Sequence, residues 1–355
     1  MSTRATELIR PAILALSAYP VPSSAGFIKL DAMENPYAFP AELKPALMAH
    51  LADASLNRYP DAGAGELRTA LRRAMNIPEG LDIVLGNGSD EIIQIIAAAC
   101  AKPGAKLLSF EPSFVMFKMI ATFCGLGYVG VPLTADFEID IEATRSAITQ
   151  HQPAVTFIAY PNNPTGNLFD RDAIREILQI SPGLVVIDEA YFAFSSDSLL
   201  GEVANFPNAV LMRTVSKLGL AGLRLGLLAG HPEWICEFDK VRLPYNINSL
   251  TQVAATFALK HYDALLAQAT TLRDQRSRLS TALRAIPDVT VFPSEANFVL
   301  IRVPNSEKTF NALLSRKILV KHTNASHPLL RNTLRVTIGT PAENTALISA
   351  LRDSI

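Results

Sequence analysis

The sequence predicts an α/β protein with a large domain, built on a mostly parallel seven-stranded sheet, and a smaller α+β domain. From about residue 81 onward, short aliphatic runs alternate with longer amphipathic ones, the pattern of a parallel sheet covered by helices on both faces. A second group of strands and helices follows residue 255. The chain has 355 residues, of which 49% are apolar and 18% charged, enough for two well-buried cores.

Seven apolar runs bounded by Gly, Pro or Asn are expected to form the large sheet: 82–85, 105–110, 127–133, 154–160, 183–190, 208–213 and 225–230. Several of the segments between them begin with Ser or Asp, which cap the free N–H groups at the start of a helix. We therefore place the large domain at residues 34–255 and the small one at 256–355. Residues 1–33 have too few apolar side chains for a core of their own, so this arm is expected to pack on the small domain or on a dimer partner.

The charge balance and the cysteines exclude several classes of protein. Lys and Arg total 32 against 33 for Asp and Glu, which leaves no basic field to attract nucleic acid or an anionic membrane. No apolar run approaches the length of a membrane span, and the six histidines show no metal-ligand spacing. Cys100, Cys124 and Cys236 are scattered, as in a reduced intracellular protein. We therefore expect a cytoplasmic protein that acts on small molecules and holds no metal.

Ligands of open α/β sheets bind at the carboxyl ends of the strands, so the residues that follow strands are the first candidates for a site. In VLGNGSDE, Gly88, Ser89 and Asp90 stand between a strand and a helix. Backbone N–H groups there favour an anion such as phosphate, although ordinary strand-to-helix connections have the same pattern. In YPNNPTG, Asn163 follows a strand, either as a ligand or within a plain Asx turn.

Two further segments carry charges in apolar surroundings. In LVVIDEAYFAF, Asp188 ends an apolar strand and Tyr191 stands three residues later. The carboxylate either meets a cation from another segment or caps the next turn, because a buried charge without a partner is costly. In TVSKLGLAGLRLG, Lys217 and Arg224 are surrounded by small and aliphatic residues. Taken alone, this stretch favours a solvated loop.

Together these segments resemble the fold-type I pyridoxal 5′-phosphate (PLP) aminotransferases and, within them, the histidinol-phosphate aminotransferases. The resemblance covers nearly the whole chain in order, through SAYPVP, DAMENPY, NRYPD, GNGSDE, EPSFVMF, YPNNPTG, VIDEAY, TVSKLGLAGLRLG, LPYNINS, EANFVL and LRVTIGT. It implies the PLP-dependent transferase fold of type I and the transamination of L-histidinol phosphate with 2-oxoglutarate to imidazole acetol phosphate and glutamate, a step of histidine biosynthesis.

Other activities of the same fold are the alternatives. They are an aromatic amino acid aminotransferase, a threonine-phosphate decarboxylase, and a catalytically silent binding protein. The stretches LPYNINS and SAYPVP favour histidinol phosphate over the first two. A silent protein has no need for Lys217, Asp188, Tyr191 and Arg224 together.

The resemblance also implies roles for most of the candidates. Lys217 would bind PLP as a Schiff base and then move a proton during catalysis, and Asp188 would pair with the pyridinium nitrogen. Asn163 and Tyr191 would hold the phenolic oxygen of PLP, and Phe114, a tyrosine in many relatives, would stack on the ring. The groups that would hold the cofactor phosphate are Gly88, Ser89, Asp90, Thr214, Ser216, Arg224 and, from the neighbouring subunit, Tyr59. The last of these implies a homodimer with shared active sites.

The substrate site implied by the resemblance centres on Arg335 in LRVTIGT. Its planar fork would bind the carboxylate of glutamate or 2-oxoglutarate and the phosphate of the other substrate in turn. Further residues fall in stretches that line the same pocket in this family: Tyr19, Asn35, Asn163 and Asn297. Two positions depart from the family pattern. Met33 stands where many relatives have Asn, and Lys321 stands where many have an Arg that helps hold the substrate phosphate, so its charge is a point rather than a fork.

Overall fold

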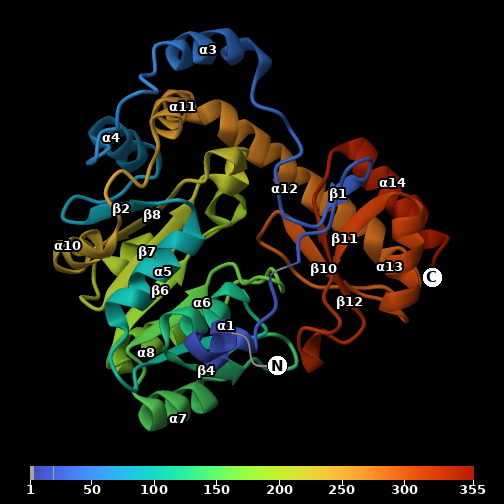
Figure 1. Ribbon diagram of the computed structural model, residues 1–355. Coiled ribbons are helices and arrows are strands. Elements are labelled where there is room, and N and C mark those ends of the chain that lie inside the picture. The colour runs from blue at the N-terminus through green and yellow to red at the C-terminus, as the bar shows by residue number, and fades with distance from the viewer. Residues whose placement is uncertain (1–3, 19) are drawn as a thin grey trace.

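The computed structural model describes residues 4–18 and 20–355 and contains two sheets (Figure 1). The strands of the larger sheet lie in the order β2-β8-β7-β6-β5-β3-β4. Their bounds are β2 Asp82–Gly86, β3 Lys106–Glu111, β4 Gly127–Pro132, β5 Val155–Ala159, β6 Leu184–Asp188, β7 Ala209–Thr214 and β8 Gly226–Gly230. Strand β8 is antiparallel to both of its neighbours, and all other neighbouring pairs are parallel. The mostly parallel seven-stranded sheet is therefore confirmed.

Helices cover both faces of this sheet, which explains why central strands such as β5 and β6 are buried along their whole length. One face packs against α5 Ser89–Cys100, α6 Met116–Cys124 and α10 Pro232–Val241. The other packs against α4 Gly65–Ala74, α7 Ile141–His151, α8 Arg171–Ile180, α9 Leu200–Val203 and α11 Ser249–Lys260. Two of these helices begin with the predicted caps. The Asp140 side chain accepts from the Ala143 N–H at the start of α7, and the Asp170 side chain accepts from the Asp172 N–H at the start of α8.

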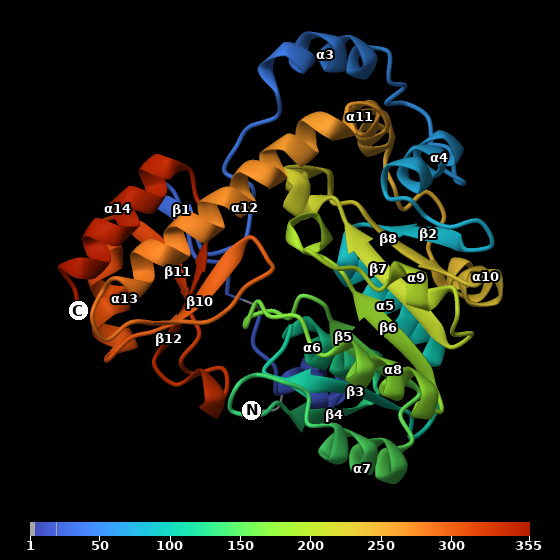
Figure 2. The ribbon, with the colours of Figure 1, turned by 180° about the vertical axis from the view of Figure 1, so that it is seen from behind.

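The smaller sheet has five strands in the order β1-β11-β12-β10-β9. They are β1 Ile28–Leu30, β9 Thr290–Val291, β10 Phe298–Arg302, β11 Ile318–His322 and β12 Thr333–Thr337. One face packs on α12 Tyr262–Arg284, α13 Ser306–Ser315 and α14 Pro341–Arg352. The other face includes Leu300, which belongs to the core of the large sheet. The long helix α12 runs from the large unit along the small one (Figures 1 and 2).

The N-terminal segment contacts both units. Helix α1 Arg4–Leu8 is followed by α2 Pro11–Leu14, which contacts α6, and Arg10 Nη2 donates to Phe123 O. Strand β1 then pairs in parallel with β11 of the small sheet. A three-residue strand is too short to show a period, which is why the sequence pattern did not predict β1.

The remaining helical elements are short or peripheral. They are α3 Lys44–Ala52 and the 3-10 turns η1 Ala41–Leu43, η2 Phe192–Phe194, η3 Ser216–Leu218, η4 Ala221–Leu223 and η5 Pro328–Leu330. Within the described ranges, no helix combines the length and the apolar character that crossing a bilayer requires.

Candidate active site

The candidate residues converge at one edge of the large sheet. The parallel strands β3, β5, β6 and β7 end there, and the loops that follow them carry Phe114, Asn163, Tyr191 and Lys217. These loops surround a cavity of about 100 Å³. Its lining is Met33, Ser89, Asp90, Phe114, Ala159, Pro161, Asn163, Asp188, Ala190, Tyr191, Thr214, Ser216, Lys217 and Arg224. Ten of the predicted residues thus share one cavity.

One end of the cavity suits an anion. Gly88 precedes α5 with a φ of +78°, and a Cβ at this position would lie 2.7 Å from Arg224 Nη2. The guanidinium can therefore approach the N-terminus of α5 only over a glycine. Arg224 Nη2 also lies 3.7 Å from Asp90 Oδ2, and both side chains are about half exposed. Backbone N–H groups and a guanidinium together form a phosphate-binding arrangement.

Two hydroxyl groups lie beside this end. Thr214 Oγ1 is 2.9 Å from Ser216 Oγ and 2.9 Å from the Leu225 carbonyl, and the Ser216 N–H donates back to Thr214 Oγ1 at 3.1 Å. These contacts of Thr214 hold the backbone of the turn between β7 and β8 in place. Both Thr214 and Ser216 line the cavity.

Asp188 brings a buried carboxylate to the cavity. The residue is 4% exposed, and the one hydrogen bond to its carboxylate among the described residues comes from the Ala190 N–H at 3.0 Å. Burial raises the pKa of this carboxyl to about 7, against the effect of that hydrogen bond. Burial disfavours the ionised form of this carboxyl, so a cation placed next to it stabilises the carboxylate strongly. A protonated ring nitrogen is such a cation.

Lys217 stands on η3, at the carboxyl end of β7, with its Nζ 3.2 Å from the Ala32 carbonyl. Burial lowers the pKa of this amine to about 8, and the positive charge of Arg335 acts in the same direction. At pH 7, an amine with a pKa of 8 is neutral in about 10% of molecules, against about 0.04% for an ordinary lysine. The site therefore provides a nucleophilic amine.

Asn163 and Tyr191 are buried on the side of the cavity that faces the small domain. Asn163 Oδ1 accepts a hydrogen bond from Arg335 Nη1 at 2.6 Å, which directs its Nδ2 donor elsewhere. The Tyr191 ring packs edge to face on Phe298 at 5.1 Å, and burial raises the pKa of its hydroxyl. Tyr191 therefore stays protonated and can donate to an oxyanion such as a phenolate.

Three consecutive backbone carbonyls after β1 hold three of the predicted residues. The carbonyl of Asp31 accepts from Arg335 Nη2 at 2.7 Å, that of Ala32 from Lys217 Nζ, and that of Met33 from Asn297 Nδ2 at 2.9 Å. We call residues 31–33 the carbonyl strap. Sequence reasoning did not find it, because a backbone carbonyl has no residue signature.

Met33 itself has a φ of +52°, and its N–H donates to Thr337 Oγ1 at 3.0 Å. Asn adopts this left-handed backbone more readily than Met, which gives a physical reason for the asparagine that the family resemblance implies at this position. The substitution leaves an apolar side chain on the cavity wall.

Besides Gly88, five predicted residues of the described chain lie outside the cavity lining. Arg335 is 8% exposed and reaches the site through Asn163. Lys321 on β11 is paired in register with Arg335 on β12. Asn35 Nδ2 donates to Gln268 Oε1 at 2.9 Å, and Asn297 bonds the carbonyl strap, so both hold neighbouring segments of the chain together. Tyr59 is exposed and stacked on Tyr245. Tyr19 lies outside the described residues.

The arrangement fits PLP. It offers an anion for the ring nitrogen at Asp188, an amine for the aldehyde carbon at Lys217, donors for the phenolic oxygen at Asn163 and Tyr191, and an anion-binding end at Arg224. Phe114, which packs edge to face on Phe117 at 5.5 Å, presents an aromatic ring to the same cavity. The described residues contain no group of three His, Cys, Asp or Glu side chains that could hold a metal ion.

Comparison with known proteins agrees with this site. The chain matches the family model described as aminotransferase class I and II over residues 25–351. It is 55% identical to a histidinol-phosphate aminotransferase from Chromobacterium violaceum, over 99% of both chains.

Solved structures give the same picture. The crystal structure of the histidinol-phosphate aminotransferase from Clostridium acetobutylicum is similar with a TM-score of 0.83 at 26% identity, covering 92% of this chain and 98% of that one. The histidinol-phosphate aminotransferase from Sinorhizobium meliloti, solved in complex with PLP, shares the fold with a TM-score of 0.87 at 23% identity over 99% of both chains. The chain thus belongs to the class I and II aminotransferase family and, within it, to the histidinol-phosphate aminotransferases.

Proposed function

We propose that this aminotransferase transfers the amino group between L-histidinol phosphate and 2-oxoglutarate, giving imidazole acetol phosphate and glutamate in histidine biosynthesis. The observation that carries the choice of substrate is the pairing of Lys321 with Arg335 across β11 and β12. Residues paired in this way point to the same face of the sheet, and like charges placed opposite each other destabilise it. A phosphate dianion bound on that face would meet both positive charges. The names of the relatives support the same substrate.

Pyridoxal 5′-phosphate is the cofactor, and when bound it supplies a conjugated ring that accepts electrons from the substrate carbon. Asp188 keeps the ring nitrogen protonated, so that the ring stays electron-poor. Lys217 Nζ would act as the base that takes the proton from the substrate carbon that bears the amino group and would hold it for return. Arg335 binds the substrate anion. Because Arg335 is hydrogen-bonded to Asn163, the anion lies next to Asn163, which is the residue proposed to hold the phenolic oxygen of the cofactor.

Substrate choice tests this proposal. We expect kcat/KM with histidinol phosphate to exceed that with phenylalanine or tyrosine when 2-oxoglutarate is the acceptor. Lys321→Ala should lower kcat/KM for histidinol phosphate roughly 10- to 100-fold, because a hydrogen bond to a charged group contributes about 1.5–3 kcal/mol. The half-reaction with glutamate, which has no phosphate, should keep its rate. Single-turnover kinetics of the two half-reactions measure both effects.

Two variants act as controls for the Lys321 experiment. Lys321→Arg retains the charge and should retain phosphate recognition, whereas Lys308→Ala removes an exposed lysine from α13 of the same domain and should change neither half-reaction. Faster turnover of phosphate-free aromatic amino acids would instead identify an aromatic amino acid aminotransferase. Release of CO₂ from threonine phosphate would identify the decarboxylase.

We also propose a homodimer in which Tyr59 completes the phosphate site of the partner subunit. The Tyr59 side chain is 81% exposed, stacks on Tyr245 at 4.5 Å and does not line the cavity of its own chain. Nearby exposed apolar residues, Leu243 and Tyr245, suit a subunit interface. Tyr59→Phe is expected to raise the Kd for PLP roughly tenfold, because one hydrogen bond to a charged oxygen is lost. Fluorescence titration of the cofactor-free protein measures this change.

Mixed dimers show whether Tyr59 acts across the interface. A subunit with Lys217→Ala supplies an intact Tyr59, and a subunit with Tyr59→Ala supplies an intact Lys217. In the mixed dimer, one of the two sites therefore has both residues, and PLP affinity and activity at that site should return to the wild-type level. A mixture that gives only the average of the two parent proteins would show that Tyr59 does not act in the partner's site.

We propose the cytoplasm as the location of the enzyme. The three cysteines support this, because Cys100, Cys124 and Cys236 are all free thiols.

A further inference from the structure

One segment of the small domain, residues 294–298, lies directly against the active site. The Phe298 ring packs on Tyr191, and the Arg335 guanidinium lies 5.4 Å from the centroid of the same ring. Asn297 in the same segment holds the carbonyl of Met33. The position of this segment therefore sets where Arg335 stands relative to the large-domain residues that surround the cofactor site.

Glu295 connects this segment to two loops of the large domain. Its backbone N–H donates to the Gly166 carbonyl at 2.7 Å, and its Oε2 accepts from the Ser196 N–H at 2.8 Å. Gly166 lies in the loop after β5 that carries Asn163, and Ser196 follows Tyr191 in the loop after β6. Gly166 has a φ of +85°, and a Cβ there would lie 2.7 Å from Ser294 Oγ, so the two segments meet at close range.

Arg276 on α12 completes the connection. Its Nη1 donates to the Phe194 carbonyl at 3.1 Å and to the Ala296 carbonyl at 2.9 Å. Its Nη2 lies 3.5 Å from Glu295 Oε2, and the guanidinium side chain is 13% exposed against 31% for Glu295. Phe194 belongs to the same loop as Tyr191. We call Glu295 and Arg276 together the domain latch.

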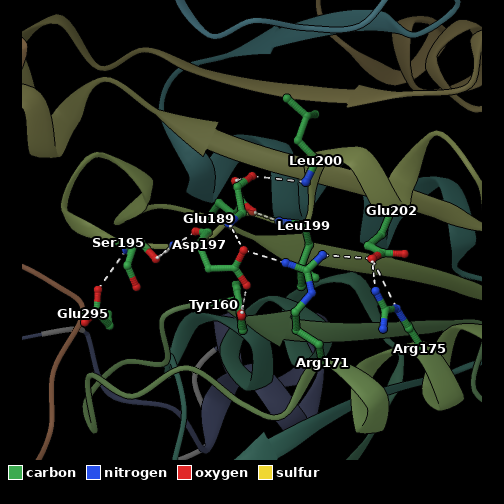
Figure 3. Close-up of polar contacts among 12 residues, drawn as sticks. Tyr160, Arg171, Arg175, Glu189, Ser195, Asp197, Leu199, Leu200, Glu202 and Glu295 are labelled. Atoms are coloured by element: carbon green, nitrogen blue, oxygen red, sulfur yellow. Dashed lines mark hydrogen bonds and ion pairs between the residues drawn. The ribbon is translucent and has the colours of Figure 1, made fainter.

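The large-domain loop to which the latch attaches is itself held firmly (Figure 3). Asp197 accepts from Tyr160 Oη at 2.7 Å and from Arg171 Nη1 at 2.5 Å. Glu189 accepts from the Leu199 N–H at 2.6 Å. Because these contacts fix the loop to the large sheet, the latch joins the small domain to a rigid support.

We propose that Glu295 is a positioning residue that sets the placement of Arg335 over the active site. This rests on the proposed role of Arg335 as the group that binds the substrate anion. Glu295 does not line the cavity, so it acts through the segment that carries Asn297 and Phe298. Loss of its carboxylate frees the small domain to shift, which weakens the binding of an anion between Arg335 and Asn163. The proton transfer at Lys217 stays intact once substrate is bound.

Two substitutions at Glu295 test the proposal in the PLP-loaded enzyme. Glu295→Ala removes the acceptor for the Ser196 N–H, whereas Glu295→Gln retains an acceptor oxygen and loses only the charge near Arg276. Glu295→Ala should raise the KM for 2-oxoglutarate and the Kd for glutarate, an unreactive dicarboxylate, roughly tenfold, with kcat nearly unchanged. Glu295→Gln should give a smaller rise. Calorimetry with glutarate and steady-state kinetics measure the two constants, and hydrogen exchange should be faster at the Ser196 amide in the alanine variant.

The results separate the latch from a purely stabilising contact. If both variants have a lower Tm but unchanged KM and Kd, Glu295 only stabilises the domain junction and the proposal is wrong. If the alanine variant does not fold, the KM for 2-oxoglutarate and the Kd for glutarate of the glutamine variant test the proposal in its place. Glu307→Ala, at an exposed glutamate of the same domain, should change neither constant. Arg335→Ala, measured in parallel, distinguishes the positioning role of Glu295 from the anion-binding role of Arg335. An unchanged KM for 2-oxoglutarate in Arg335→Ala would contradict the anion-binding role itself.

Discussion

Replacing Lys217 with alanine is expected to lower kcat/KM by roughly four to six orders of magnitude, the usual cost of removing a residue on which every chemical step depends. No other amine of the described residues lines the cavity. Arg224 shares the lining but is always protonated, so it can neither bond to the aldehyde carbon nor take up a proton. The variant should still bind PLP through Asp188 and the phosphate-binding end. It should not retain PLP after borohydride treatment, whereas the wild type should carry PLP on the Lys217 peptide, and mass spectrometry of the peptide that contains position 217 compares the two.

The pH dependence of cofactor capture gives an independent check on Lys217. Only the neutral amine attacks the aldehyde, and burial lowers the pKa of this amine to about 8. The rate at which the cofactor-free protein captures PLP should therefore rise from pH 6 and level off above pH 8, and not continue to rise toward pH 10. Lys102→Ala, at an exposed lysine elsewhere in the large domain, should leave this profile unchanged. A visible absorption band of bound cofactor that persists unaltered in Lys217→Ala would contradict the assignment.

The sequence predicted the parts of the site that follow strands. Asp188 was a candidate because a carboxylate at the end of an apolar strand is costly unless it meets a cation or caps a turn. Lys217 and Arg224, which alone favoured a solvated loop, became candidates through the family resemblance. Parallel strands end at one edge of the sheet, so locating their ends was enough to bring Asn163 and Gly88 to the same place.

The small-domain contributions were harder to predict, for physical reasons. The carbonyl strap acts through backbone atoms that any residue supplies, and its partners are about 180 to 300 positions away in the chain. The resemblance assigned Asn35 and Asn297 to the substrate pocket, but their amides bond Gln268 and the Met33 carbonyl. Local sequence does not determine which of several neighbours an amide bonds. Glu295 opens the EANFVL stretch, but it was assigned no role, because a single glutamate before a strand is an ordinary surface residue.

Asp188→Asn is expected to lower kcat roughly 100-fold or more, because a neutral amide cannot keep the ring nitrogen of PLP protonated and a charge-assisted contact is lost. The substitution is nearly isosteric, and the amide oxygen can still accept from the Ala190 N–H. Folding and cavity shape should therefore be preserved, and the loss should appear in kcat for both half-reactions. Asp136→Asn, at an exposed position, is the matched control and should retain full activity.

The same substitution should stabilise the cofactor-free protein while it disables the enzyme. Burial raises the pKa of Asp188 to about 7 from its ordinary 3.8, so the folded state binds more protons than the unfolded state between these values. Ionisation of Asp188 then costs the folded protein on the order of 4 kcal/mol at pH 8, and asparagine avoids this cost. The gain in Tm should be absent near pH 4, grow as the pH rises to 7 and remain constant above it. With PLP bound, the protonated ring nitrogen offsets the buried charge, so the order of the two proteins should reverse at pH 8. A cofactor-free Asp188→Asn protein that is no more stable than the wild type at pH 8 would show that Asp188 is satisfied without the cofactor, and the residue would then be a structural one.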